Sequence, residues 1–364
     1  MIATPPLTKS SDTLFAVQYL RAAAALAVVF YHVSALSQET WGLDPERVDH
    51  VGAAGVDLFF VISGFIMAMI VGRPGRFDVR DFWIRRVARV VPAYWVITLL
   101  VFVLAWTLPS LFNSTVASLH NLFVSLSFVA LEQSDGNTGP LLVVGWTLNY
   151  EMAFYVLVAV TAGLFSDRRL LAASAVIIAV VVTGIVAHPA NLTLEFYTNP
   201  ILLEFVFGIL VYHAWKWGGG RELGGRRLAS IAIFALGIIL LVGQWERPLQ
   251  DWRPFFWGVP AMAVLYGGLG VLTFTSPFLA RLGYWSYALY ITHVFVVTLY
   301  IKHIMSAIAP ISLPWQAHYL IMTGAALAVA AGFYTLVERP LSRLTLAWLR
   351  RPRALSVAEP SHGA

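Results

Sequence analysis

Ten apolar runs of 16 to 25 residues follow one another along this chain of 364 residues. A membrane-spanning helix needs about 20 mostly apolar residues, with roughly 17 as the lower limit. Charged residues make up 12% of the chain, whereas an average soluble domain has roughly 25%. This composition excludes a soluble, disordered or coiled-coil protein and leaves an integral membrane protein. The predicted spans are Leu14–Leu36, Val51–Val71, Pro92–Leu108, Leu141–Phe165, Leu170–Ala187, Ile201–Trp217, Leu228–Gly243, Phe255–Phe274, Tyr284–Ile304 and Ala317–Val337.

The predicted fold is all-α, because an unpaired backbone amide in lipid costs several kcal/mol and a helix pairs its amides internally. We expect about ten transmembrane helices and, at Ala117–Leu131, a short amphipathic helix that is re-entrant or interfacial. The expected organisation is a cytoplasmic N-terminal segment over residues 1–13, a membrane domain over 14–337 and a basic cytoplasmic tail over 338–364.

Basic residues are concentrated in alternate loops, and the loops between them hold few cations and several acids. The basic loops and the tail carry Arg73, Arg76, Arg80, Arg85, Arg86, Arg168, Arg169, Lys216, Arg221, Arg226, Arg227, Arg281, Arg343, Arg350, Arg351 and Arg353. The positive-inside rule then predicts that both termini are cytoplasmic. The same pattern accounts for the net charge of +5 without any nucleic-acid partner.

The chain has no cysteine, which excludes disulfides, thiolate metal sites and a cysteine nucleophile. Its histidines show no metal-ligand spacing, so no metal is expected.

Ionisable residues inside the predicted spans are candidates for function, because a charge near the bilayer centre costs at least about 2.5–3.5 kcal/mol. They are few: Arg21, His32, Asp57, Glu151, Glu204, His213 and His293. Arg21 and His32 share one helix face, since eleven steps of about 100° nearly complete three turns, and they stand about 16 Å apart along the axis. A cation near the cytoplasm and an imidazole nearer the outer surface suit a long anionic ligand. The alternative is that Arg21 extends to the inner headgroups and His32 makes a core contact.

Two carboxylates could act with this histidine. Asp57 enters the second span from the outside, and we expect it at a depth similar to His32, where it would orient the imidazole. The alternative is an acid favoured by the dipole at a helix N-terminus. Glu151 falls near the midplane, so it should face the interior and meet a cation or a hydrogen-bond donor. His293 reaches a similar depth, and a structural clasp between Glu151 and a histidine or arginine is the alternative.

Arg85, Arg86 and Arg89 are neighbours on a predicted helix that precedes the third span. An arginine cluster beside a membrane cavity can bind phosphate groups. The alternative is ordinary anchoring on anionic lipid, worth about 1 kcal/mol per charge.

These segments together resemble the membrane acyltransferase-3 family over nearly the whole chain. The resemblance rests on Arg21 and His32 separated by ten residues, on Gly-Val-Asp-Leu-Phe-Phe-Val-Ile-Ser-Gly-Phe at 55–65, and on the Arg85-Arg86-x2-Arg89-x2-Pro92 motif. It continues with Trp-Thr-Leu-x2-Glu at 146–151, Tyr-x2-His at 290–293 and Glu-Arg-Pro at 338–340. Within the family, Gly-Trp-Thr-Leu-Asn-Tyr-Glu at 145–151 is most similar to exopolysaccharide O-acetyltransferases of the ExoZ-like, succinoglycan-type group.

The resemblance implies a multi-pass protein of the bacterial cytoplasmic (inner) membrane that uses cytoplasmic acetyl-CoA as co-substrate and a carbohydrate hydroxyl as acceptor. The acceptor is a lipid-linked repeat or a polymer, and polysaccharide-assembly proteins are possible partners. The coenzyme phosphates would meet Arg85, Arg86 and Arg89, and its arm would pass Arg21. His32 would be the general base.

Four further residues would assist His32. Asp57 or Glu151 would orient its imidazole, and Tyr290 or His293 would donate to the developing oxyanion.

A transporter or flippase of lipid-linked sugar is the rival hypothesis, since transporters also bury charged residues near the bilayer midplane. The lack of an internal repeat and the placement of cations low and histidine high argue against it. A scaffold within a polysaccharide-assembly complex would explain neither the buried ions nor the arginine cluster.

Overall fold

The computed structural model describes residues 14–41, 50–73, 75, 77–109, 117–131, 138–165, 168–219, 227–244, 252–305 and 313–351. Every regular element in this part of the chain is helical, which confirms the predicted all-α membrane fold. The helices are α1 (Phe15–Trp41), α2 (Ala54–Val71), α3 (Val79–Thr107), α4 (Leu119–Ser127), α5 (Trp146–Leu164), α6 (Arg169–Ala187), α7 (Leu192–Tyr197), α8 (Leu203–Trp217), α9 (Arg227–Val242), α10 (Val259–Val271), α11 (Pro277–Leu299), α13 (Trp315–Phe333) and α14 (Arg339–Leu349).

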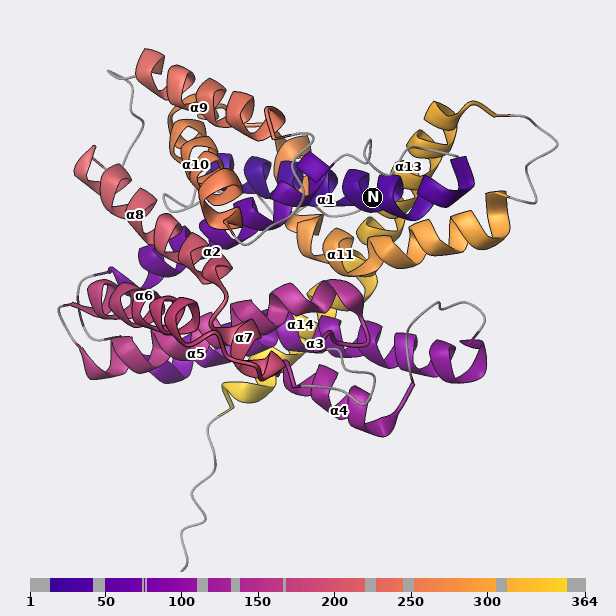
Figure 1. Ribbon diagram of the computed structural model, residues 1–364, viewed down its shortest axis with the longest axis horizontal. Coiled ribbons are helices and arrows are strands. Elements are labelled where there is room, and N and C mark those ends of the chain that lie inside the picture. Colours follow the sequence, from indigo (N-terminus) through magenta and orange to yellow (C-terminus); the bar gives the residue numbers. More distant parts are fainter. Residues whose placement is uncertain are drawn as a thin grey trace, which may run out of the picture.

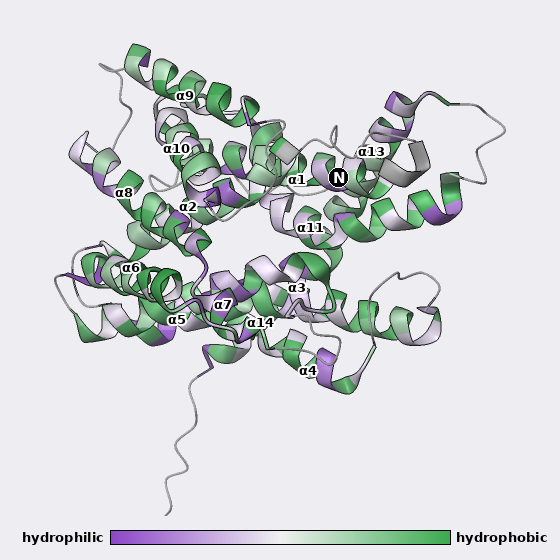
Figure 2. Ribbon diagram, in the orientation of Figure 1, coloured by the Kyte–Doolittle hydropathy of each residue, from purple (hydrophilic) through white to green (hydrophobic). Residues whose placement is uncertain are grey.

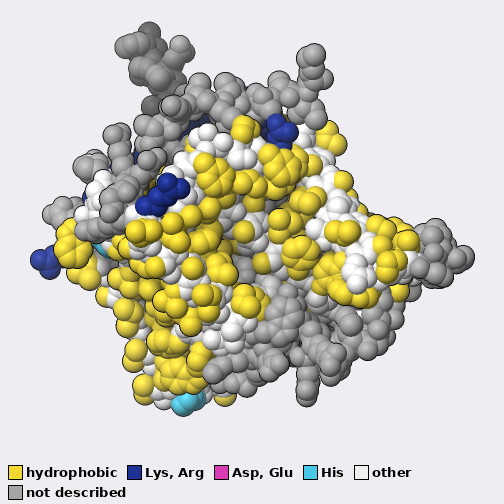
Figure 3. Space-filling model, turned by 90° about the horizontal axis from the view of Figure 1, so that it is seen from above, with side chains coloured by type: hydrophobic (Ala, Val, Ile, Leu, Met, Phe, Trp, Pro, Cys, Tyr) yellow, Lys and Arg dark blue, Asp and Glu magenta, His cyan; other side chains and the backbone are white. Residues whose placement is uncertain are grey.

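Nine helical stretches within the described residues are long and apolar enough to cross a membrane. The seventh predicted span, Leu228–Gly243, corresponds to α9, which is apolar but has only 16 residues. Figure 2 shows hydrophobic residues along most of the helices, and Figure 3 shows a largely apolar outer surface. Side chains such as Val186 and Leu320 are about three-quarters exposed, as expected for residues that face lipid tails. The orientation of the termini remains a prediction.

The helices that matter for the site form two layers (Figure 1). Helices α1, α2 and α11 lie in one layer, with α1 packed against both α2 and α11. Helices α3 and α5 lie in the other layer and contact each other. Side chains that point from both layers into the space between them therefore come from segments far apart in the sequence.

Helix α2 is held close to α8 because glycines let the two backbones touch. A Cβ atom on Gly64 would lie 2.1 Å from the carbonyl oxygen of Phe205, and one on Gly208 would lie 2.0 Å from that of Val61. Real side-chain atoms do not approach so closely, so both positions require glycine. Small residues at helix crossings are typical of membrane bundles, where close packing replaces the hydrophobic driving force.

The last predicted region, 338–364, includes a helix. A π-helical segment, Tyr334–Glu338, joins α13 directly to α14, and α14 packs against α3. Arg350 at its end forms an ion pair of 2.5 Å with Asp81. Residues 1–13 and 352–364 lie outside the described residues, and the proposed domain limits stay a prediction. The amphipathic stretch Ala117–Leu131 contains the short helix α4, which begins with a side-chain cap from Ser118.

Candidate active site

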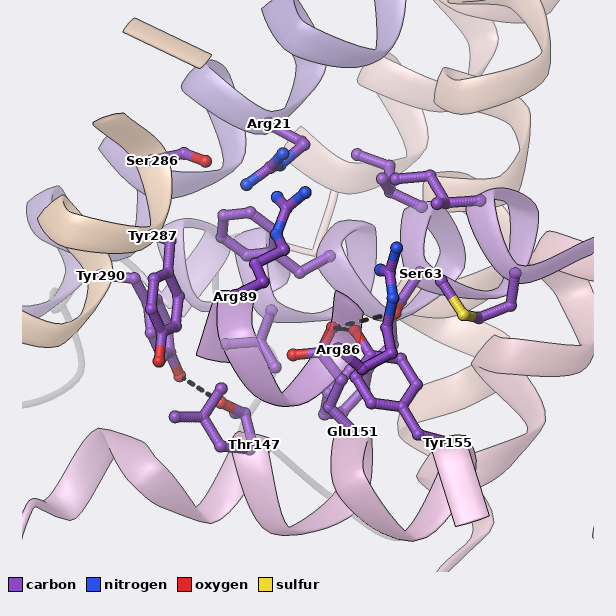
Figure 4. Close-up of a pocket in the computed structure, with 17 residues that line it drawn as sticks. Arg21, Ser63, Arg86, Arg89, Thr147, Glu151, Tyr155, Ser286, Tyr287 and Tyr290 are labelled. Atoms are coloured by element: carbon purple, nitrogen blue, oxygen red, sulfur yellow. Dashed lines mark hydrogen bonds between the residues drawn. The ribbon is translucent and has the colours of Figure 1, made fainter. Parts of the chain in front are cut away.

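A cavity of about 90 Å³ lies between the two helix layers. Helices α1, α2, α3, α5 and α11 all contribute to its wall, and Figure 4 shows the polar side chains that face it. The lining residues are Arg21, Val56, Phe59, Phe60, Ile62, Ser63, Ile66, Met67, Arg86, Arg89, Thr147, Leu148, Glu151, Tyr155, Ser286, Tyr287 and Tyr290. No group of three or more histidine, cysteine, aspartate or glutamate side chains in the described part of the chain is arranged to hold a metal ion.

Three arginines converge on this cavity. Arg21 comes from α1 and is only 8% exposed, whereas Arg86 and Arg89 come from α3 (Figure 4). None of the three forms an ion pair within 4.0 Å or a hydrogen bond with another described residue. The Arg86 guanidinium lies 5.7 Å from the ring centroid of Tyr155, and its Nε atom is buried without a hydrogen-bond partner. Arginines held together in this way are able to bind a polyanion through charge-assisted hydrogen bonds.

Arg85 does not belong to this group, which corrects the expectation that it would bind phosphate with its neighbours. Its side chain is 55% exposed and forms an ion pair of 2.5 Å with Asp81. Asp81 lies one helical turn earlier on the same face of α3, so it attracts the Arg85 side chain away from the cavity.

Glu151 on α5 faces the interior and accepts hydrogen bonds there. The Ser63 hydroxyl on α2 donates to Glu151 Oε1 over 3.2 Å, and the Tyr155 hydroxyl donates to the same oxygen. The carboxylate therefore links α2 to α5 beside the cavity and places one negative charge close to the three arginines (Figure 4).

His32 and His293 contact each other at the interface of α1 and α11. Nε2 of His293 lies 3.2 Å from Nδ1 of His32. Each Nδ1 also lies 3.0 Å from the carbonyl oxygen one turn earlier in its own helix, that of Val28 for His32 and of Leu289 for His293. His293 is fully buried, and His32 is partly buried.

These contacts determine which ring nitrogens carry hydrogen. A carbonyl oxygen only accepts, so both Nδ1 atoms must carry the proton that they donate. Nε2 of His293 faces the Nδ1–H group of His32 and must therefore accept from it. A neutral His32 then has its lone pair on Nε2, the nitrogen that points away from His293.

The two histidines do not line the cavity. Tyr290 and Phe59 do line the cavity, and their rings are in edge-to-face contact with centroids 5.8 Å apart. The Tyr290 ring lies 6.0 Å from that of His293, and the His293 ring lies 4.9 Å from that of His32. Tyr290 therefore lines the cavity and also lies beside His293.

The expected oxyanion donors have other partners. The Tyr290 hydroxyl donates to the Val144 carbonyl oxygen over 3.1 Å and accepts from Thr147 over 2.9 Å. His293 donates to Leu289, and its other nitrogen is an acceptor. In this conformation both side chains have their protons engaged within the protein, and their role as oxyanion donors stays a prediction.

Asp57 does not reach His32. Gly52 and Gly55 pack against the carbonyl oxygens of Ala27 and Ala24, respectively, so α1 and α2 are antiparallel. Asp57 therefore lies near the depth of Ala24 or below it, at least about 12 Å along the helix axis from His32. The expectation that both residues share one depth is wrong, because this register could not be read from the length of the spans.

The partner of Asp57 is Arg253, just before α10. Arg253 donates to both carboxylate oxygens, over 2.8 and 2.7 Å, and to the carbonyl oxygen of Ala53 over 3.1 Å. Burial lowers the pKa of Arg253, but the hydrogen bonds and charge of Asp57 outweigh this and raise its pKa above the ordinary value. Glu204 on α8 is also fully buried near this pair.

Comparisons with known proteins identify the family. A model described as an acyltransferase domain matches residues 14–335. The exopolysaccharide production protein ExoZ of Rhizobium meliloti (strain 1021) is 34% identical over 86% of this chain and 95% of its own length. Acyltransferase MdmB of Streptomyces mycarofaciens is 26% identical over 89% of this chain and 90% of its own.

A putative peptidoglycan O-acetyltransferase, YrhL of Bacillus subtilis (strain 168), is 29% identical over 38% of this chain and 22% of its own length. No solved structure gives a significant match. The predicted enzyme class is confirmed by these matches over nearly the whole chain. The chain belongs to the acyltransferase-3 family and is a membrane acyltransferase.

Proposed function

We propose that this protein transfers an acetyl group from acetyl-CoA to a hydroxyl group of a cell-surface or exopolysaccharide sugar. The observation that carries the proposal is the convergence of Arg21, Arg86 and Arg89 on one cavity, without an ion-pair partner among the described residues. Glu151 is the one carboxylate among the lining residues, so the three cations leave an excess of positive charge that favours an anionic ligand, since charge inside a membrane protein is costly.

The residues present fit coenzyme A. The coenzyme carries its phosphates at one end and its thioester at the other end of a thin arm. The three arginines would hold the phosphates, and apolar residues of α2, including Ile62 and Ile66, offer a surface for the arm. The cavity of about 90 Å³ is far too small for the nucleotide part, which would stay at the predicted cytoplasmic end. Acetyl-CoA supplies the activated acetyl group for this chemistry.

His32 is the general base in this proposal. Its Nε2 atom takes the proton of the acceptor hydroxyl as that oxygen attacks the acetyl carbonyl carbon, and later returns the proton to the departing sulfur. His293 holds the imidazole so that the lone pair is on Nε2. A positioned base of this kind contributes about 10²–10⁴-fold to a rate. Glu151 stabilises the arginine cluster and does not contact His32.

The relatives support the acceptor class. One is named for exopolysaccharide production and another for peptidoglycan O-acetylation, so a carbohydrate hydroxyl is the acceptor that we propose here. We place the protein in the bacterial cytoplasmic membrane with both termini inside, beside polysaccharide-assembly proteins that would supply or consume the acceptor.

The test is twofold. Purified protein in lipid nanodiscs, mixed with acetyl-CoA labelled in the acetyl group, should consume the donor, at least by slow hydrolysis. Mass spectrometry of the polysaccharide from cells with and without the protein should show acetyl groups that depend on it. His32→Ala should abolish both signals, whereas His213→Ala, an exposed histidine on α8, should not. Full acetylation with His32→Ala at normal expression would contradict the assignment of the base.

A further inference from the structure

Helix α2 provides an apolar path from the arginines toward the histidines. Its cavity-lining residues extend from Val56 to Met67, a length of about 16 Å along the axis. Figure 4 shows Arg86 and Tyr155 at one side of the cavity and Tyr290 at the other, with Arg21 and Arg89 between them. A ligand whose anionic end binds the arginines therefore extends its other end toward Tyr290.

Phe59 and Tyr290 lie together in the cavity wall. The Phe59 ring stands edge-to-face on the Tyr290 ring, at a centroid distance of 5.8 Å. Phe59 is partly buried and packs against two separate groups of buried residues. The larger group surrounds the cavity, and the smaller one, which includes Val29 and Leu289, lies between α1, α11 and α13. Phe59 thus lies where the cavity wall meets this smaller group.

The two aromatic side chains differ in how firmly they are held. Hydrogen bonds to Thr147 and Val144 fix the Tyr290 hydroxyl at 2.9 and 3.1 Å. Phe59 has no polar atom in its side chain and is held by packing alone. The Phe59 ring is therefore the side chain of this pair whose replacement would enlarge the cavity without breaking a hydrogen bond.

We propose that Phe59 determines the length of the acyl group that this enzyme accepts. The inference rests on the proposed function, which places the acyl end of the donor between the arginines and His32. In this proposal the methyl group of the acetyl donor lies against the phenyl ring, and each added methylene of a longer acyl group would clash with it. A pocket of this kind discriminates by about 10–200-fold per methylene.

The experiment compares acetyl-, propionyl- and butyryl-CoA as donors for the purified full-length enzyme in nanodiscs. Wild type should prefer acetyl-CoA, and Phe59→Ala should raise the butyryl-to-acetyl ratio of kcat/KM by about 10-fold or more. The affinity for CoA without an acyl group should change little, because the arginines are untouched. Phe123→Ala, a matched change at an exposed phenylalanine of α4, should leave the ratio at its wild-type value.

Phe59→Leu keeps the test decisive if Phe59→Ala folds poorly, and it should shift the ratio in the same direction by a smaller factor. An unchanged ratio in a folded Phe59 variant, with acyl-CoA still consumed, would overturn the role of Phe59 and leave the proposed function intact. If wild type consumed no acyl-CoA at all, the proposed function itself would fail.

Discussion

Nε2 of His293 lies 3.2 Å from Nδ1 of His32, and this contact orients the imidazole that we assign as the base. His293→Leu removes the acceptor for the Nδ1–H group, whereas His293→Gln retains an oxygen that can accept. A neutral hydrogen bond contributes about 0.5–1.5 kcal/mol, so we expect kcat to fall about 3–10-fold in the leucine variant and less in the glutamine variant.

The KM for acetyl-CoA should stay near its wild-type value in both variants, because His293 does not line the cavity. Steady-state kinetics with His213→Leu as control separates this effect from a loss of folded protein. Equal losses of kcat in the glutamine and leucine variants would argue that His293 acts through packing alone.

Neighbouring arginines on α3 should differ sharply in donor binding. Arg86→Gln and Arg89→Gln each remove a cation from the cavity, and a hydrogen bond to a charged group contributes about 1.5–3 kcal/mol. We therefore expect CoA affinity to fall about 10–100-fold for each, and the wild-type affinity to weaken as salt is added.

Arg85→Gln is the matched control for the arginines, because it lies on the same helix but is exposed and paired with Asp81. Its effect on the dissociation constant, measured by isothermal titration calorimetry at fixed ionic strength, should stay below about 3-fold, as for other exposed pairs. A loss of CoA affinity in Arg85→Gln as large as that in Arg86→Gln would indicate that the phosphates bind outside the cavity.

Much of this site was predictable from the sequence, and for a physical reason. A charge inside an apolar run cannot stay in lipid, so Arg21 and Glu151 had to face the interior. Helical periodicity then placed Arg86 and Arg89 side by side. Both placements follow from local spacing and from the cost of charge in lipid, which can be judged from a single amino-acid sequence.

The expectations that the structure contradicts concern how the helices pack against one another. The depth of Asp57 follows from where Gly55 touches α1, and no span length contains that register. One signal did point to Arg253: a buried acid near the predicted outer surface needs a cation, and the predicted outer loops hold few. The absence of His32 from the cavity wall could not be predicted, because it depends on side-chain packing between α1, α2 and α11.

The Asp57–Arg253 pair should stabilise the fold without affecting the pH dependence of catalysis by His32. Arg253→Met leaves a buried carboxylate unpaired, which costs about 3–5 kcal/mol, and the double variant with Asp57→Leu should recover most of that loss. Thermal unfolding in detergent measures the loss in the single variant and the recovery in the double variant. Asp57→Asn should keep the pH profile of kcat unchanged in the protein that folds. A shifted profile would restore the earlier hypothesis that Asp57 orients His32.

Two glycine-to-alanine changes should separate helix contact from helix propensity. A Cβ at Gly208 would lie 2.0 Å from the Val61 carbonyl oxygen and 2.6 Å from the Phe65 backbone nitrogen. Neither backbone atom can move without shifting α2, whose Ser63 donates to Glu151 beside the cavity. Overpacking of this kind costs typically about 1–3 kcal/mol, so we expect Gly208→Ala to lower both the unfolding temperature and the rate.

Gly324 on α13 is the matched control, since no described atom lies within 4 Å of the position of its Cβ. Alanine in the interior of a helix is favoured over glycine by about 1 kcal/mol, so Gly324→Ala should leave stability unchanged or raise it slightly. Thermal unfolding of both variants in the same detergent makes the comparison. Equal stability of the two variants would mean that α2 and α8 are farther apart than their glycines indicate.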